Sequence, residues 1–344
     1  MEHRPIHSSW SAARSAAIAV VSSPVTKTTA GLIIGGLSLY LAVRDVDLLR
    51  VGVILSGVGL GFVGLALLSV AINTWSKAAR WGVLLGEAGR HISTIQLTTS
   101  LLVGQMLNLL LPVRVGDISR AVMVGGMGPG RVYTLGTVVL EKVIDMLCFA
   151  LLFVMTVLVI PLPELLTQSA YVTVLVAVAG AAVMIVLAYR PDWFLVSSQH
   201  LLRWLPERAR AGLMPRLQAA LASLASIRNQ TDRVKIAGLS LVNWGTAILT
   251  NQMLMWACGI HLPLIASVVL LLVLLAGINL PSLPGRIGLF EYLCVVVLGL
   301  FGIDKELAFS YGVLLHGVLL LPMALAGGLF YLTLRRPAAN QQAG

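Results

Sequence analysis

Two short segments of this 344-residue chain each place an arginine between a proline and a glycine. The first reads PVRVG, at positions 112–116, and the second reads PGRIG, at positions 284–288. A guanidinium group recognises phosphate well, because its planar fork donates two hydrogen bonds at once and keeps its charge when partly desolvated. Proline and glycine interrupt helices and free backbone N–H groups, which also favours anions. The pattern therefore predicts that Arg114 and Arg286 bind one phosphate group.

Other charged residues stand near these segments in otherwise apolar sequence. They are Asp117, Arg120, Glu141, Lys142, Asp145 and Glu291. A charge inside a membrane costs about 2.5 to 3.5 kcal/mol even on lenient insertion scales, so it usually faces a partner or a water-filled cavity. Asp117 and Arg120 are three residues apart, so a helix would place them on one face. The same holds for Glu141 and Asp145, which are four apart. We expect all six residues to line a substrate-binding cavity.

The sequence leaves a structural role for these charges open. In that interpretation Arg114 pairs with Glu141 or Asp145 across a helix interface. Arg286 pairs in the same way with Glu291. The carboxylates would then fix how the helices pack, and they would neither orient a bound phosphate nor exchange protons.

We expect no metal, no cofactor and no enzymatic activity. The cysteines Cys148, Cys258 and Cys294 are scattered singly. His261 and His316 are also isolated, so neither residue type offers a ligand set. The sequence lacks a nucleophile arrangement and a phosphate-binding loop of the G-x-x-x-x-G-K type. The net charge of +10 is explained by loops that face an anionic leaflet, so we expect no nucleic-acid partner.

The elements that must position these residues are membrane helices. Hydrophobic residues make up 58% of the chain and charged residues only 11%, and the mean hydropathy is +0.92. These values are typical of a polytopic membrane protein, and apolar runs of about 20 residues predict helices, whereas a barrel would alternate in short segments. We predict an all-α membrane helix bundle with about six full spans, at 28–43, 51–72, 132–160, 171–189, 235–258 and 308–334.

Two further apolar stretches, 91–127 and 262–301, are each interrupted by one arginine segment. The predicted hinge positions, where one helix ends and the next begins, are Pro112, Gly116, Pro284, Gly285 and Gly288. A stretch that enters and leaves on the same side is a re-entrant hairpin. If both stretches are such hairpins, each half holds three spans and one hairpin, and this odd number of spans reverses the orientation of the second half. The two prolines are half the chain length apart, so the halves 28–160 and 171–334 would form an inverted repeat, as in secondary transporters. The alternative is that each stretch is two full spans joined by a Pro-Gly turn.

Lysine and arginine in the short loops predict the orientation of the chain. Lys77, Arg80 and Arg90 follow the second predicted span, so we expect them in a cytoplasmic loop. Segments 161–168 and 259–263 contain neither residue type and are expected outside. Both termini are then cytoplasmic, in a multi-pass protein of the cell membrane.

This organisation predicts one large domain between two tails. Residues 1–27 and 335–344 are the tails, and residues 28–334 form the transmembrane domain. Within it, segment 190–234 interleaves tryptophan and leucine with arginine, which is typical of an amphipathic helix lying on an anionic leaflet. A solvated connector is the alternative for this segment.

Three segments together resemble a known family: NLLLPVRVGDISRAVMV, VVLEKVIDML and LPSLPGRIGLFEYL. Over residues 30–333 the chain is similar to the flippase-like integral membrane family that includes the transmembrane part of lysylphosphatidylglycerol synthase, the multiple peptide resistance factor. Asp117 stands where the family usually has glutamate, and Lys142 stands where it usually has arginine. Arg286 is an extra charge at a position that is commonly small, which bears on the headgroup that is accepted.

The resemblance implies movement of lipids between leaflets, or service to pathways that use polyprenyl-phosphate-linked glycans. We expect a lipid translocase, or flippase, whose cargo is an anionic or aminoacylated phospholipid or a polyprenyl-phosphate-linked lipid. One alternative is a membrane enzyme with Glu141 or Asp145 as base. Another is a non-transporting scaffold that anchors a lipid-modifying enzyme or a glycosyltransferase. Either role is compatible with an oligomer. No segment resembles the lysyl-transferring domain of the synthase, so that activity is not expected.

Overall fold

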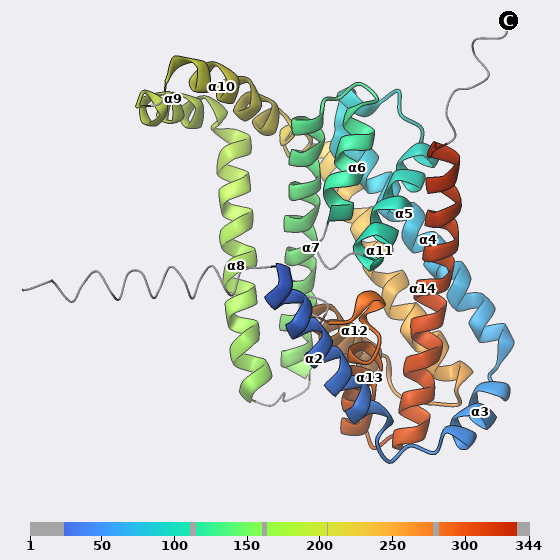
Figure 1. Cartoon of the computed structure of the whole chain (residues 1–344). Coiled ribbons are helices and arrows are strands. Elements are labelled where there is room, and N and C mark those ends of the chain that lie inside the picture. The colour runs from blue at the N-terminus through green and yellow to red at the C-terminus, as the bar shows by residue number, and fades with distance from the viewer. Residues whose placement is uncertain (1–23, 111–114, 160–163, 205, 278–281, 336–344) are drawn as a thin grey trace, which may run out of the picture.

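The computed structural model describes residues 24–110, 115–159, 164–204, 206–277 and 282–335. Pro112, Arg114 and most of both predicted tails therefore lie outside the described residues. Every regular element in the described ranges is a helix, so the prediction of an all-α fold is confirmed (Figure 1). In chain order the elements are α2 (Pro24–Val43), α3 (Leu48–Ser56), α4 (Leu60–Leu85), η1 (Gly86–Gly89), α5 (Thr94–Leu110), α6 (Val115–Gly125), α7 (Arg131–Val159), α8 (Glu164–Tyr189), α9 (Pro191–Leu202), α10 (Glu207–Ala222), η2 (Ala225–Ile227), α11 (Gln230–Ala257), α12 (Leu264–Gly277), η3 (Pro284–Arg286), α13 (Leu289–Leu300) and α14 (Lys305–Arg335).

Three helical segments among the described residues are long and apolar enough, by length and composition, to cross a membrane. They are Leu60–Gly89, Arg131–Val159 and Lys305–Leu329. The number rises to four if α8 and α9, which bend by 93° at their junction, form one broken span. The prediction of six full spans is therefore supported only in part. Of the remaining candidates, α2 has only a short apolar part, Gly31–Val43, and α11 is long but rich in polar residues.

Helices α4 and α11 run side by side and make the most extensive helix contact in the described structure. The side-chain amide of Asn73 on α4 donates to the backbone oxygen of Asn243 at 2.6 Å and to the hydroxyl of Thr246 at 3.0 Å. Thr250 on α11 donates to Ser69 on α4 at 3.0 Å. Hydrogen bonds between polar side chains join membrane helices in this way. The polar residues of α11 named here therefore meet a neighbouring helix, although they lower its hydropathy.

The predicted span 51–72 is wrong in its boundaries, because the helix breaks between α3 and α4. Gly57 ends α3 by donating its N–H to the backbone oxygens of Val53 and Ile54. The N–H of Gly59 donates at 2.9 Å to the backbone oxygen of Ala257, at the end of α11. Hydropathy does not reveal this break, since apolar residues continue across it. The long helix is shifted toward the C-terminus and takes in sequence that was assigned to a cytoplasmic loop.

Helices α5 and α6 pack against each other as a hairpin around two facing glycines. A Cβ atom on Gly116 would lie 1.8 Å from the backbone oxygen of Gly104, so the two backbones are in direct contact. The side-chain oxygen of Asn108 on α5 accepts from the N–H of Gly116 at 2.8 Å. Helix α6 has 11 residues, about 17 Å at 1.5 Å per residue, so it is too short to cross about 30 Å of hydrocarbon.

Helices α12 and α13 form a second hairpin, which enters the bundle from the opposite end (Figure 1). They have 14 and 12 residues, so neither is long enough to span the hydrocarbon. The connection between them includes η3, which packs against α5. Helix α14 contacts both α5 and α13. Two short hairpins from opposite ends of the bundle therefore approach each other in its interior.

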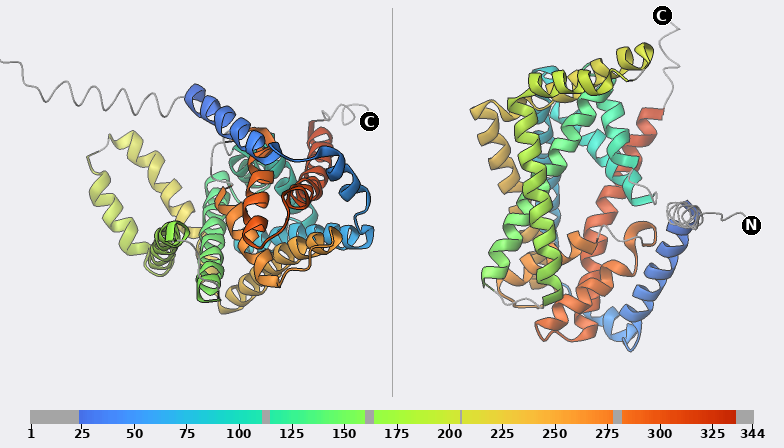
Figure 2. Two further views of the ribbon diagram at one scale, coloured as in Figure 1. Left: turned by 90° about the horizontal axis from the view of Figure 1, so that it is seen from below. Right: turned by 90° about the vertical axis from the view of Figure 1, so that its left-hand side faces the viewer.

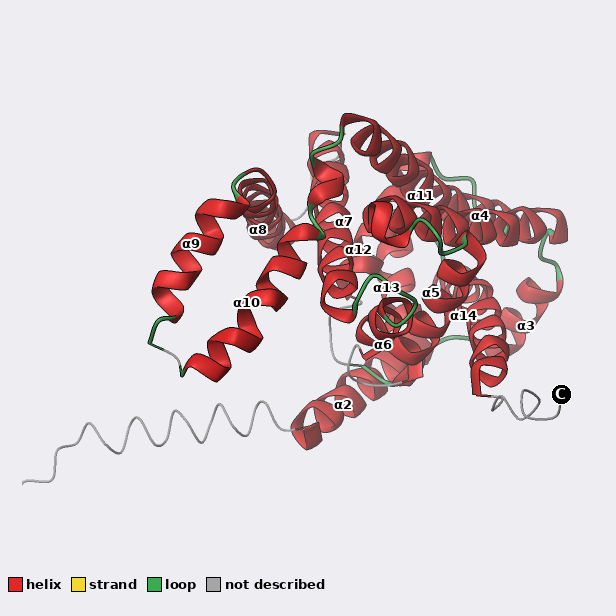
Figure 3. Ribbon diagram, turned by 90° about the horizontal axis from the view of Figure 1, so that it is seen from above, coloured by secondary structure: helices red, strands yellow, loops and turns green. Residues whose placement is uncertain are grey.

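Helices α8, α9 and α10 form a lobe at one side of the bundle (Figures 2 and 3). Helix α9 turns away from the axis of α8, and α10 returns to contact α7. Trp193 and Trp204 are 63% and 83% exposed in this lobe. Segment 190–234 is thus helical and runs across the end of the bundle, while its contact with an anionic leaflet stays a prediction.

We predict that Gly116→Ala destabilises the protein, because the added methyl group forces the backbones of α5 and α6 apart. The expected loss is about 2 kcal/mol of unfolding free energy, typical of an overpacked interior. Thermal unfolding in detergent measures it. Gly64→Ala on α4 is the matched control, since a Cβ atom there meets nothing within 4 Å. Equal melting temperatures for the two variants would contradict the close contact.

Candidate functional site

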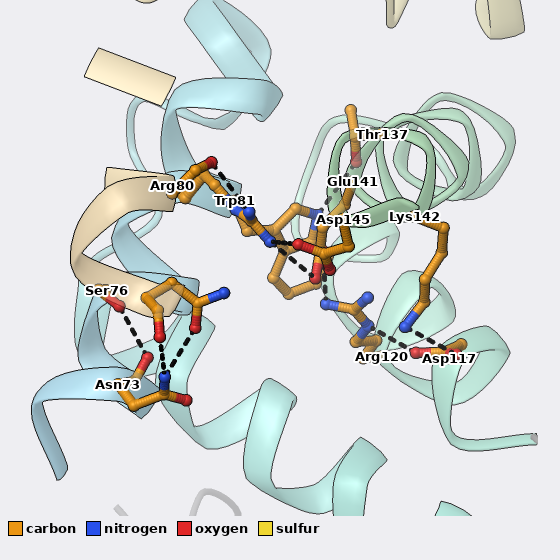
Figure 4. Close-up of polar contacts among 12 residues, drawn as sticks. Asn73, Ser76, Arg80, Trp81, Asp117, Arg120, Thr137, Glu141, Lys142 and Asp145 are labelled. Carbon is orange, nitrogen blue, oxygen red and sulfur yellow. Dashed lines mark hydrogen bonds and ion pairs between the residues drawn. The ribbon is translucent and has the colours of Figure 1, made fainter. Parts of the chain in front are cut away.

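Six charged side chains from α4, α6 and α7 form one contiguous group, which we call the charge cluster (Figure 4). Its members are Arg80 on α4, Asp117 and Arg120 on α6, and Glu141, Lys142 and Asp145 on α7. Three are cations and three are carboxylates. Lys77, which was predicted in a cytoplasmic loop, lies within α4 close enough to Asp145 and Glu141 to add a further positive charge beside the cluster. Five of the six were candidate site residues from the sequence, and the structure brings these five together with Arg80.

The centre of the charge cluster is the ion pair between Arg120 and Glu141. Nη1 of Arg120 lies 2.9 Å from Oε2 of Glu141, and the two residues are only 2% and 4% exposed. The guanidinium carbon also lies 4.8 Å from the ring centroid of Trp81, a cation–π contact. The Nε1 group of Trp81 in turn donates to Thr137 at 3.1 Å, which fixes the indole. Ion pairing and ring contact therefore hold this guanidinium between α4, α6 and α7.

Arg80 is the member of the charge cluster that sequence reasoning missed. It is fully buried within α4, so its predicted position in a cytoplasmic loop is wrong. Its Nη2 lies 2.7 Å from Asp145 and 3.9 Å from Glu141, and its Nη1 donates to Ser240 on α11 at 3.0 Å. No local signal in the sequence marks Arg80, because hydropathy placed the end of this span at position 72, before Arg80.

The charge cluster reaches the surface through Asp117 and Lys142. Asp117 lies 3.3 Å from Nε of Arg120 and, through its other oxygen, 3.3 Å from Nζ of Lys142. The side chain of Lys142 is 46% exposed, whereas that of Arg80 is fully buried. Charges therefore alternate along a chain of contacts from an accessible lysine to a buried arginine.

Glu141 and Asp145 pair with arginines, but with other arginines than the one predicted from the sequence. Their partners in the described structure are Arg120 and Arg80. Arg114, the partner proposed from the sequence, lies outside the described residues, so its contacts stay a prediction. Helix α4 continues to Leu85 and therefore contains Arg80, whereas the predicted span ended at position 72.

The remaining predicted residues gather at the turn between α12 and α13. The N–H of Gly288 donates to Oε2 of Glu291 at 2.7 Å, which caps the first turn of α13. The other carboxylate oxygen contacts Nδ1 of His316, and Nε2 of His316 lies 2.8 Å from the backbone oxygen of Gly285. His316 was treated as an isolated histidine, because its 25-residue separation from Glu291 gives no local signal.

Arg286 lies in this turn beside a small pocket with mainly apolar walls. The lining residues are Leu274, Gly277, Arg286, Leu289, Phe290 and Leu293. The backbone φ of Arg286 is 62°, in the left-handed region that favours glycine. Pro284 begins η3, and Gly285 stands between it and Arg286. The structure thus places the second arginine segment at a sharp, non-helical connection between two short helices.

Within the described ranges, no group of three or more histidine, cysteine, aspartate or glutamate side chains is placed to hold a metal ion. The cysteines Cys148, Cys258 and Cys294 are all free thiols. The chemistry that this arrangement offers is electrostatic recognition by guanidinium and ammonium groups, with carboxylates that compensate their charge.

We predict strong energetic coupling between Arg120 and Glu141. Glu141→Gln leaves Arg120 with only Asp117 at 3.3 Å, and Arg120→Gln leaves Glu141 with only Arg80 at 3.9 Å. Each single variant therefore under-compensates a buried charge, at a typical cost of about 3 kcal/mol, whereas the double variant removes both charges and recovers part of the loss. Unfolding in mixed micelles measures the four free energies. The exposed pair Glu87 and Arg90, with 3.1 Å between charged atoms, is the matched control and should show no measurable coupling. Additive losses at Arg120 and Glu141 would contradict the pairing.

The arrangement of two short hairpins and a buried charge cluster can be compared with known proteins. A family model described as the lysylphosphatidylglycerol synthase TM region matches residues 28–327. The match includes the charge cluster, both hairpins and the turn that carries Arg286. Comparisons with curated proteins and with solved structures gave no match. Because the family model covers most of the chain, the protein belongs to the lysylphosphatidylglycerol synthase transmembrane-region family.

Proposed function

We propose that this protein is a lipid translocase that moves an anionic or aminoacylated phospholipid, or a polyprenyl-phosphate-linked lipid, between the leaflets of the cell membrane. One observation carries the proposal: two hairpins built from short helices enter the bundle from opposite ends, and the turn of one, which carries Arg286, packs against the other. In this proposal the lipid crosses without any bond being made or broken, so the protein is not an enzyme.

The order of the helices supports an inverted repeat as part of this proposal. In the first half a long helix, α4, is followed by the α5–α6 hairpin and then by a second long helix, α7. The second half repeats this order with α11, the α12–α13 hairpin and α14. The two hairpins enter from opposite ends, and the corresponding helices α4 and α11 pair extensively. Secondary transporters place their substrate between broken helices related in this way.

The surroundings of Arg286 suit an amphiphilic cargo. A guanidinium beside the apolar side chains of Leu274, Leu289 and Phe290 offers a cation for a headgroup phosphate next to apolar surface. Arg114 is proposed as the second phosphate ligand, from the sequence pattern alone. Membership in a family named after lysylphosphatidylglycerol synthase supports an aminoacylated phospholipid as the cargo.

The distribution of charge supports an orientation with the α9–α10 end toward the cytoplasm. The end of α4, the start of α7, helices α9 and α10 and the end of α14 lie at this end of the bundle (Figure 1). Arginines at this end in the described residues include Arg90, Arg131, Arg190, Arg203 and Arg228. At the other end Arg44 lies 3.2 Å from Asp45, and Arg50 lies 3.9 Å from Glu306. An excess of arginine favours the cytoplasmic side.

A non-transporting scaffold for a lipid-modifying enzyme or a glycosyltransferase is the second candidate. The observation that favours it is the internal pairing of the charge cluster, in which every carboxylate faces a cation of the same chain. Such a cluster is able to serve helix packing alone. The two candidates differ in what purified protein does in the absence of any partner.

We predict that Arg286→Gln slows the movement of fluorescent lysylphosphatidylglycerol across proteoliposome membranes while the protein keeps its melting temperature. Removal of the guanidinium takes away the proposed phosphate contact, which is typically worth about 1.5 to 3 kcal/mol, so the initial rate should fall at least about tenfold. Arg286→Lys should recover part of the rate, because it keeps the charge and loses the fork. Arg114→Gln should act in the same direction.

Arg90→Gln is the matched control for this experiment. Arg90 is an exposed arginine at the end of the bundle and pairs with the neighbouring Glu87, so its loss should leave the rate unchanged. A scaffold predicts that folded wild-type protein moves no lipid above the rate of empty vesicles. Wild-type rates in stable Arg286→Gln protein would instead reject this residue as a phosphate ligand.

A further inference from the structure

The turn that carries Arg286 holds an unfavourable backbone conformation. Gly285, Arg286 and Gly288 have φ angles of 74°, 62° and 87°. Glycine adopts this region freely, but an arginine there is strained. A strained residue persists only when its surroundings hold it in place. The groups that fix this turn therefore also fix the backbone position from which the side chain of Arg286 extends.

Three hydrogen bonds hold the turn. The N–H of Arg286 donates to the backbone oxygen of Leu283 at 2.7 Å. The N–H of Gly288 donates to Oε2 of Glu291 at 2.7 Å, and Nε2 of His316 lies 2.8 Å from the backbone oxygen of Gly285. Two of these three contacts come from the side chains of Glu291 and His316, which contact each other. Both side chains are only 8% exposed.

The hydrogen-bonding roles of these groups determine how many protons the pair must hold. A carbonyl oxygen only accepts, so Nε2 of His316 carries a hydrogen and donates it to Gly285. The remaining ring nitrogen, Nδ1, faces a carboxylate oxygen of Glu291. Two lone pairs would face each other there unless one more proton lies between them, on Nδ1 or on the carboxyl group. The contact between Nδ1 and the carboxylate therefore requires this shared proton.

We propose that Glu291 and His316 are positioning residues that share one proton, and that this proton holds the turn in the conformation that presents Arg286. When the proton leaves, the lone pairs repel each other, and α14 loses its hold on the backbone of Gly285. The strained turn is then released. The consequence for lipid movement rests on the translocase function proposed above, whereas the hold on the turn does not.

The surroundings shield the pair from water. Phe290 stacks on the ring of His316 with centroids 4.6 Å apart, which shields one face of the imidazole. Cys294, further along α13, is close enough to Glu291 to interact with it electrostatically, and Arg286 stands in the turn itself. Of the elements packed against the pair, α12 contributes no ionisable side chain in its described residues.

The test compares melting temperature and lipid movement across pH in wild-type protein and Glu291→Gln. A glutamine amide donates to Nδ1 of neutral His316 and its oxygen accepts from Gly288, so this variant forms both contacts without the shared proton. We expect the wild-type melting temperature to fall as the pH is raised from mildly acidic to alkaline and the proton is lost, and that of Glu291→Gln to fall much less. Wild-type lipid movement should slow about tenfold over the same range, since fewer molecules hold the competent turn.

Two more variants separate positioning from general stability. His316→Gln cannot satisfy both Gly285 and Glu291, so its melting temperature should be lower than that of wild-type protein at every pH. His91→Gln is the matched control, because His91 also contacts a backbone oxygen, that of Met127 at 2.8 Å, far from this turn in the sequence. It should keep the wild-type pH response.

The outcomes are distinct. A wild-type melting temperature that is flat across this range, or a Glu291→Gln variant with the full wild-type response, overturns the shared proton. If wild-type protein moves no lipid at any pH, the translocase function is rejected, and the melting curves still decide whether the shared proton holds the turn.

Discussion

The ion pair between Arg120 and Glu141 is the interaction on which the arrangement of the first hairpin depends. Helix α6 is too short to be anchored at both membrane surfaces, and this pair ties it to α7. A buried guanidinium has no stable alternative in hydrocarbon, so its carboxylate partner must stay in reach. Arg80 extends the same network to α4 and, through Ser240, to α11. These contacts thereby connect the short helix α6 to α4 and α11, the two helices with the most extensive contact in the described structure.

The two hairpins solve the same problem by different means. The first is closed by direct backbone contact between Gly104 and Gly116 and is tied to its neighbours by buried charges. The second carries fewer charges and is fixed at its turn by Glu291 and by His316 from α14. In the proposed function this difference has a purpose: the first hairpin supplies a stable wall, whereas the second has a turn that is strained, held by few contacts and therefore able to move. A lipid headgroup needs both a fixed path and a step that releases it.

The sequence was sufficient for the fold class, the membrane setting and the positions of both interrupted stretches, because hydropathy, proline and glycine report on these directly. It also identified five of the six members of the charge cluster, since charges in apolar sequence are costly and therefore conspicuous. It failed where the decisive fact is a contact between distant segments. Nothing local distinguishes Arg80 from a loop arginine until the break at Gly57 and Gly59 shifts the helix, and that break is made by a hydrogen bond to Ala257. His316 is invisible for the same reason, because its partner lies on another helix.

The central claim is that both hairpin turns lie inside the membrane, where a headgroup can meet them from either leaflet. Single cysteines introduced at Val113 and Ile287, in protein without the three native cysteines, test it through labelling by a bulky impermeant thiol reagent applied to each side of sealed vesicles. A cysteine at Trp204, which is 83% exposed in the α9–α10 lobe, reports full reactivity from one side. The account predicts slow labelling at 113 and 287 from both sides. Rapid labelling of position 113 from the side opposite to Trp204 would show that the first hairpin crosses the membrane completely, and it would contradict the account.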